Sequence, residues 1–125
     1  MTADDVQAWI DRYLDAWRSY RPDAIGDLFA ADATYAYHPW DEGDQVDRGR
    51  AAIVASWLET PDPPGSWSAQ YRPMLVSGDQ AVIVGITRYA DGGVFHNLWQ
   101  VRFDAAARCA DFVEWYMKPP AGAGG

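Results

Sequence analysis

The sequence contains a single cysteine, Cys109, so it cannot form an intramolecular disulfide bond. A thiol in a strand-like, apolar context is most often a small buried side chain. No stretch approaches the roughly 20 apolar residues that a membrane-spanning helix requires. The first residues, Met1–Asp5, are acidic and lack the apolar segment of a signal peptide. These absences predict a cytoplasmic protein that does not associate with membranes.

Positive charge is also scarce in this chain. It has 10 Lys and Arg residues against 18 Asp and Glu residues, which gives a net charge of -8 and a pI near 4.4. The basic residues are scattered, whereas nucleic-acid binding needs a clustered cationic face. The composition therefore argues against nucleic acids and anionic membranes as partners.

Sequence motifs for phosphate binding, nucleophilic catalysis and metal binding are also missing. There is no Gly-rich phosphate loop, no Gly-x-Ser-x-Gly elbow and no Cys/His nucleophile pair. His38, His96 and Glu114 do not follow the spacing of a metal-ligand motif. We therefore expect neither a metal ion nor a cofactor.

What the chain does contain is enough apolar material for one core. Its 125 residues are 49% hydrophobic and 14% aromatic, which suits a single domain that is stable without disulfides or metals. Residues 119–125 begin with two prolines and continue in Ala and Gly. We predict one domain over residues 1–118 and a flexible tail over residues 119–125.

Apolar periodicity predicts three helices in the first half of the chain. The first helix repeats apolar side chains along one face, and Thr2 with Asp5 resembles a capping box before it. Pro22 marks the start of a second, short helix. The predicted helices cover residues 3–19, a few residues from Pro22, and residues 49–58.

The second half alternates apolar and polar residues, which is the pattern of β-strands. An earlier strand follows a turn at Ala31–Asp32 and ends before Pro39. The expected strands cover residues 34–38, 67–76, 81–89, 95–103 and 109–117, with loops at 41–47 and 60–65. Helices first and hairpin-linked strands later indicate an α+β fold. Three N-terminal helices then cover one face of a curved antiparallel sheet.

Four segments carry a resemblance to a known family. They are Tyr13–Trp17, Leu28–Tyr35, Gly49–Ile53 and Val101–Asp104. With this order of elements, the chain resembles the nuclear-transport-factor-2-like superfamily, and within it the SnoaL-like group, over nearly its whole length. The resemblance implies a cone-shaped sheet around an apolar pocket, and homodimers formed through the outer sheet face. The superfamily includes isomerases, cyclases, dehydratases, hydrolases and non-enzymes.

The end of the first strand carries Tyr37, His38, Trp40 and Asp41, which predicts the rim or floor of a pocket. The resemblance puts Tyr37 or His38 where steroid isomerases of the superfamily keep a carboxylate base. His38 could replace that base, because imidazole titrates near neutral pH. Asp41 could orient His38 or act itself. The alternatives are a histidine that caps the strand end and a solvated loop carboxylate.

Tyr13 matches the isomerase tyrosine that donates a hydrogen bond to an oxyanion, although it also fits the apolar stripe of its helix. Trp99 stands where those enzymes have a second acid. Asn97 interrupts an apolar strand face, so it needs a partner: a ligand, a water or an internal group such as a tyrosine hydroxyl. Alternation places His96 on the opposite face. Trp40 and Trp99 are expected to line a cavity.

Glu114 lies on a strand with apolar residues on both faces, so its direction stays open. If it faces the pocket, desolvation raises its pKa and makes it a plausible acid or base.

These residues lead to a working hypothesis for the function. The domain binds a small hydrophobic oxygenated molecule and acts as a cofactor-free acid–base enzyme of isomerase, cyclase, dehydratase or hydrolase type. The catalytic candidates are His38, Asp41 and Tyr13. The substrate-binding candidates are Tyr37, Trp40, Asn97, Trp99 and Glu114. The alternatives are a non-catalytic binding domain and a structural homodimer with a filled interior.

Overall fold

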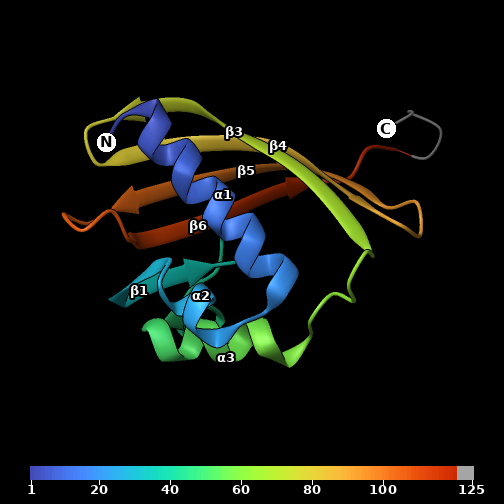
Figure 1. Cartoon of the computed structure of the whole chain (residues 1–125), viewed down its shortest axis with the longest axis horizontal. Coiled ribbons are helices and arrows are strands. Elements are labelled where there is room, and N and C mark those ends of the chain that lie inside the picture. The colour runs from blue at the N-terminus through green and yellow to red at the C-terminus, as the bar shows by residue number, and fades with distance from the viewer. Residues whose placement is uncertain (121–125) are drawn as a thin grey trace.

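Helix α1 (Ala3–Ser19) lies across the inner face of a curved sheet in the computed structural model, which describes residues 1–120 (Figure 1). The predicted bounds of this helix are confirmed. The Thr2 side chain accepts from the Asp5 N–H, and the Asp5 carboxylate accepts from the Thr2 N–H. Local capping and one apolar face are therefore sufficient to define it.

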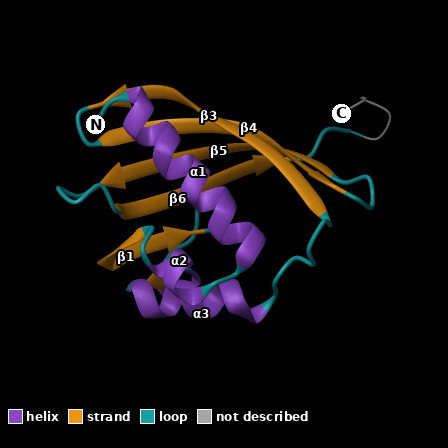
Figure 2. Ribbon diagram, viewed as in Figure 1, coloured by secondary structure: helices purple, strands orange, loops and turns teal. Residues whose placement is uncertain are grey.

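The other two helices pack beside strand β1 at one edge of the sheet (Figure 2). Helix α2 (Pro22–Gly26) starts at the predicted proline, and helix α3 (Arg50–Glu59) lies within one residue of its predicted bounds. Each contributes one fully buried isoleucine, Ile25 or Ile53, to the core. The two helices thus close the edge that α1 leaves open.

The sheet has six strands in the order β2-β1-β6-β5-β4-β3. Five pairs are adjacent, and β1 pairs with β6 in parallel while the other four pairs are antiparallel. The sheet is therefore mixed, whereas the sequence predicted an antiparallel one. No hairpin links β1 to β6, so no turn dictates their relative direction. The strands are β1 (Phe29–Ala36), β2 (Asp47–Arg48), β3 (Trp67–Ser77), β4 (Gln80–Tyr89), β5 (Val94–Phe103) and β6 (Cys109–Met117).

Two local predictions in the first half need correction. Strand β1 begins at Phe29, and the stretch predicted as a turn at Ala31–Asp32 is an irregularity in its pairing with β6. A bulge of this kind lets both residues face solvent while the strand continues. The expected loop at 41–47 contains a short 3-10 helix, Gly43–Gln45, and runs into β2.

The core lies between α1 and the inner face of the sheet. Trp9 is fully buried there, and its indole N–H donates to the Leu28 carbonyl at 3.0 Å. Its ring also contacts Phe103 edge to face at 5.4 Å. No helix in the described residues 1–120 is long and apolar enough to cross a membrane. The predicted tail falls largely on residues 121–125, which lie outside the described residues.

Candidate functional site: a tyrosine-lined pocket

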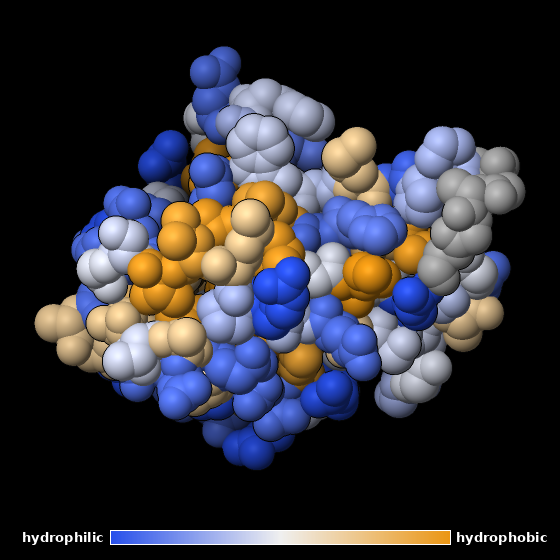
Figure 3. Space-filling model, turned by 90° about the horizontal axis from the view of Figure 1, so that it is seen from above, coloured by the Kyte–Doolittle hydropathy of each residue, from blue (hydrophilic) through white to orange (hydrophobic). Residues whose placement is uncertain are grey.

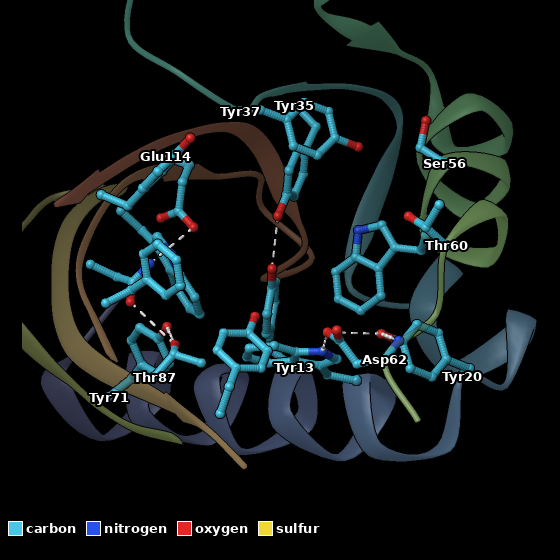
Figure 4. Close-up of a pocket in the computed structure, with 17 residues that line it drawn as sticks. Tyr13, Tyr20, Tyr35, Tyr37, Ser56, Thr60, Asp62, Tyr71, Thr87 and Glu114 are labelled. Carbon is cyan, nitrogen blue, oxygen red and sulfur yellow. Dashed lines mark hydrogen bonds between the residues drawn. The ribbon is translucent and has the colours of Figure 1, made fainter. Parts of the chain in front are cut away.

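A pocket of about 400 Å³ opens between α1, α3 and the inner face of the sheet (Figure 4). Its most distinctive property is that all seven tyrosines of the chain contribute to its wall. Aromatic rings supply apolar surface, and each hydroxyl supplies a polar contact. The lining residues are Tyr13, Trp17, Tyr20, Tyr35, Tyr37, Ser56, Trp57, Thr60, Asp62, Tyr71, Thr87, Tyr89, Phe95, Asn97, Trp99, Glu114 and Tyr116.

Glu114 is the one lining carboxylate on the sheet, and it projects from β6 into the pocket (Figure 4). Its Oε1 accepts from the Asn97 Nδ2 at 3.3 Å. Its Oε2 is buried without a hydrogen-bond partner, and so is the indole Nε1 of Trp99. Glu114 and Trp99 are directly opposite on β6 and β5. Neither atom makes a hydrogen bond of good geometry within residues 1–120, although the Trp99 indole lies close enough to favour the charged form of Glu114.

Burial raises the pKa of Glu114 to about 8, because the charged form loses its hydration. The side chains of Trp99 and Asn97 favour the charged form and oppose this shift only in part. At neutral pH most Glu114 side chains are therefore protonated. A protonated carboxyl can donate a hydrogen bond, which a carboxylate cannot.

A chain of hydrogen bonds supports Glu114 from behind. The Thr87 hydroxyl bonds to the Tyr71 hydroxyl and donates to the Asn97 Oδ1 at 3.2 Å. The Asn97 amide is thereby held in one orientation, with its Nδ2 toward Glu114. Asn97 thus has internal partners, Thr87 and Glu114, which was one of the alternatives that the sequence left open.

Tyr13 and Tyr35 point toward one another across the pocket floor and share a hydrogen bond of 2.8 Å between their hydroxyls (Figure 4). Both rings are buried, and this burial raises the pKa of each phenol well above its ordinary value. Two hydroxyls joined by one hydrogen bond retain one further proton to donate. Tyr13 is therefore a core residue that also lines the pocket, and its role as a donor to a ligand stays a prediction.

A comparison of the sequence with models of protein families identifies the family of this chain. The family model described as a SnoaL-like domain matches residues 10–115. The chain belongs to the SnoaL-like domain family. No curated protein matches the chain.

Solved structures resemble this SnoaL-like domain at low sequence identity. An NTF-2 like protein of unknown function from Burkholderia xenovorans LB400 is 16% identical with a TM-score of 0.73, over 97% of this chain and 89% of that one. A ketosteroid isomerase-like protein from Erwinia carotovora atroseptica SCRI1043 is 15% identical with a TM-score of 0.61, over 94% and 97%. A computationally designed 17-OHP binder is 10% identical with a TM-score of 0.63, over 92% and 98%. These similarities show the fold.

His38 and Asp41 lie behind the pocket wall of the SnoaL-like domain and are not among its lining residues. The His38 Nδ1 contacts the Asp41 Oδ1 at 3.0 Å, and the His38 Nε2 contacts the Tyr116 hydroxyl at 3.1 Å. Asp41 therefore contacts the His38 ring directly. His38 reaches the pocket only through Tyr116, so the geometry does not place it as a base in direct contact with a ligand.

Trp40 does not line the pocket, contrary to the prediction. It is 70% exposed and stacks on the His38 ring at a centroid distance of 4.7 Å. The reason is a turn after β1, in which the Asp41 Oδ2 accepts from the backbone N–H groups of Tyr37 and His38. This turn directs Trp40 away from the sheet interior.

The remaining predicted residues lie as follows. Tyr37, Asn97, Trp99 and Glu114 line the pocket together with Tyr13. The Tyr37 hydroxyl donates to the Asp47 carboxylate at 2.7 Å. No group of three His, Cys, Asp or Glu side chains within residues 1–120 is arranged to hold a metal ion.

Several lining residues were missed by sequence reasoning. Tyr71 and Thr87 share the inward register of β3 and β4, so strand alternation could have identified them. Asp62 carried no such signal, because it lies in a proline-rich loop. Its Oδ2 accepts from the Trp17 Nε1 at 2.9 Å, which fixes that loop against the end of α1.

Proposed function

We propose that this SnoaL-like domain binds a small hydrophobic oxygenated molecule in the tyrosine-lined pocket and uses Glu114 as its acid–base group. The observation that carries the proposal is the buried Glu114 carboxyl in the pocket wall, whose Oε2 and the neighbouring Trp99 Nε1 lack hydrogen bonds of good geometry within residues 1–120. Unpaired polar atoms at a pocket wall cost free energy unless a ligand bonds to them. A ligand oxygen that accepts from both groups would satisfy them together.

The chemistry follows from the protonation state of Glu114. Its pKa near 8 keeps the carboxyl protonated at neutral pH, so it can donate a proton to a carbonyl, ether or hydroxyl oxygen of a ligand. The resulting carboxylate can then accept a proton from a carbon or a water. Isomerases, cyclases, dehydratases and hydrolases of the cofactor-free kind all use such steps.

This assignment replaces the earlier hypothesis of His38 or Asp41 as the base. It also differs from the steroid isomerase arrangement, which the resemblance locates at the end of the first strand. Glu114 instead belongs to β6 and lies deep in the pocket. A designed protein of the same fold is described as a 17-OHP binder, which supports a small-molecule ligand for such a pocket.

Filling the pocket is expected to weaken ligand binding. Ser56 lines the pocket from α3, so Ser56→Phe would place a phenyl ring in the ligand volume. We expect the affinity for benzophenone, a neutral hydrophobic ketone, to fall at least about tenfold, as measured by isothermal titration calorimetry. The exposed neighbour Ala55 provides the matched control, because Ala55→Phe adds the same ring outside the pocket. Equal affinities in all three proteins, or no binding to any of them, would contradict the proposal.

A second proposal concerns the outer face of the sheet, which we infer forms a homodimer interface. An apolar patch is visible on the face seen from above (Figure 3). Met74 and Leu75 of β3 are 63% and 61% exposed, and Val82 and Val113 lie beside Leu75 in an apolar groove. Exposed apolar patches of this kind commonly mark contact surfaces.

A cytoplasmic location stays a prediction from the sequence.

Leu75→Asp is expected to convert a dimer to a monomer. Dimer formation would bury the new carboxylate against the apolar surface of the second protomer. Burying an unpaired charge in this way is strongly unfavourable. Light scattering after size exclusion should then give a mass of 13.9 kDa in place of twice that value. Ala51→Asp, on the exposed start of α3, is the control for added charge. A wild-type protein that is already monomeric at high concentration would refute the interface.

A further inference from the structure

Asp41 and His38, which lie in one turn, form a hydrogen-bonded chain with the distant Tyr116 that ends at the pocket wall. Asp41 contacts the His38 Nδ1 at 3.0 Å, and the His38 Nε2 contacts the Tyr116 hydroxyl at 3.1 Å. Of these residues only Tyr116 lines the pocket. The chain therefore connects a surface turn after β1 to the end of β6.

The position of the protons along this chain follows from Asp41. Its side chain is only 5% exposed, and its Oδ2 accepts two backbone N–H groups at 2.9 and 3.1 Å. A carboxylate can only accept hydrogen bonds. The His38 Nδ1 must then carry the proton that Asp41 accepts. In the neutral imidazole, the His38 Nε2 is left as an acceptor.

This tautomer fixes the direction of the last hydrogen bond. The Tyr116 hydroxyl donates its only proton to the His38 Nε2, so only its lone pairs remain available toward the pocket. Tyr116 is thereby an acceptor. Two other polar groups of the pocket, the Glu114 Oε2 at neutral pH and the Trp99 Nε1, are donors. The wall thus presents two polar subsites of opposite character.

Trp40 packs on the outer side of this hydrogen-bonded chain. Its ring stacks on the His38 imidazole with an interplanar angle of 14° and covers one face of it. Phe95, also a pocket residue, packs edge to face against Tyr116 at 5.8 Å. These contacts help to hold both rings of the His38–Tyr116 pair in place.

We propose that Tyr116 is an acceptor subsite for a ligand hydroxyl, and that the ligand class is a hydroxy ketone whose carbonyl meets Glu114 and Trp99. The inference rests on the proposed function of the same pocket. Glu114 and Tyr116 lie two residues apart on one face of β6, so their backbones are about 6.6 Å apart. The hydroxyl and carbonyl of the ligand are separated by a comparable distance. His38 and Asp41 are positioning residues in this arrangement.

Three probes test the subsite: 4-hydroxybenzophenone, 4-methoxybenzophenone and benzophenone. The methoxy group cannot donate a hydrogen bond, and benzophenone lacks the second oxygen. At pH 7 we expect the wild-type protein to bind the hydroxy probe about fivefold to tenfold more tightly than either other probe. In Tyr116→Phe the preference for the hydroxy probe over the other two probes should disappear. Titration calorimetry gives all the values.

The outcomes separate the two proposals. If benzophenone binds but the hydroxy probe gains nothing, or if its gain survives in Tyr116→Phe, the acceptor subsite is wrong and the pocket proposal stands. If none of the three probes binds, the pocket proposal fails and the subsite falls with it.

A second measurement addresses the positioning role without any ligand. Long-range ¹⁵N–¹H correlation at pH 8 should show His38 protonated at Nδ1 and bare at Nε2. Asp41→Asn should shift the tautomer population and reduce the preference for the hydroxy probe. A wild-type His38 protonated at Nε2 would overturn the assigned direction of the hydrogen bond, since Tyr116 would then be a donor to the pocket.

Discussion

The free energy of unfolding should fall by about 3 kcal/mol between pH 5 and pH 8 because of Glu114 alone, and Glu114→Gln should remove that loss. The carboxyl titrates near its model value of 4.5 in the unfolded chain and near 8 in the folded protein. Between these values the folded protein binds more protons than the unfolded chain. Stability is therefore fully present below pH 4.5 and is lost as the pH rises through 8.

Urea unfolding at pH 5, 6, 7 and 8 measures this dependence. Glutamine keeps the oxygen that accepts from Asn97 and places an amide where the protonated Oε2 stands, so the variant should fold. Above pH 7 it should be more stable than the wild type. Glu59→Gln removes a carboxyl from the exposed end of α3 and serves as the control. An identical pH slope in the wild type and Glu114→Gln would show that Glu114 is not protonated at neutral pH.

The same variant separates binding from proton transfer. The amide that Glu114→Gln introduces can still donate a hydrogen bond to a ligand carbonyl, so ketone affinity should survive near neutral pH. It cannot transfer a proton, so turnover of any substrate should be lost. Binding of benzophenone to the wild type should weaken above pH 8, where Glu114 becomes an acceptor, while binding to the variant should not.

The sequence specified those parts of the fold that depend on local interactions. Helix α1 was predicted at both ends, because its capping box and its apolar face lie within its own residues. The parallel pairing of β1 with β6 was not predicted. It joins Phe29 to Cys109, and no turn residue between such distant strands encodes their direction. Register between distant strands depends on packing of the whole sheet.

In the pocket, too, the sequence could not predict contacts between residues that are distant along the chain. The direction of Glu114 was left open, because Phe112 and Val113 give β6 an apolar residue on each face. Only the complete sheet reveals that the Phe112 face packs inside. The contact of His38 with Tyr116 spans 78 residues, so strand-end chemistry could point to His38 but not to its partner.

Gly85→Ala is expected to destabilise the domain by about 3 kcal/mol and to disturb the support of Glu114. Gly85 lies in the middle of β4, opposite Tyr71 on β3 and Asn97 on β5. A Cβ at this position would overlap the Tyr71 ring and the Gln70 carbonyl. The carbonyl belongs to the backbone ladder and cannot rotate away, so β3 itself must shift.

The shift should be transmitted to the pocket through Tyr71. Its ring stacks on Trp99 at 4.2 Å, and its hydroxyl anchors Thr87 in the chain that leads to Asn97 and Glu114. Gly85→Ala should therefore lower both the urea midpoint and the affinity for benzophenone. Gly26→Ala is the matched control, since its Cβ would meet only side-chain atoms at 3.5 Å or more. That substitution in α2 should leave stability unchanged or slightly raised, because alanine favours helix. A Gly85→Ala protein as stable as Gly26→Ala would mean that Tyr71 does not pack over the β4 backbone, and the wall that holds Glu114 in place would have to be reconsidered.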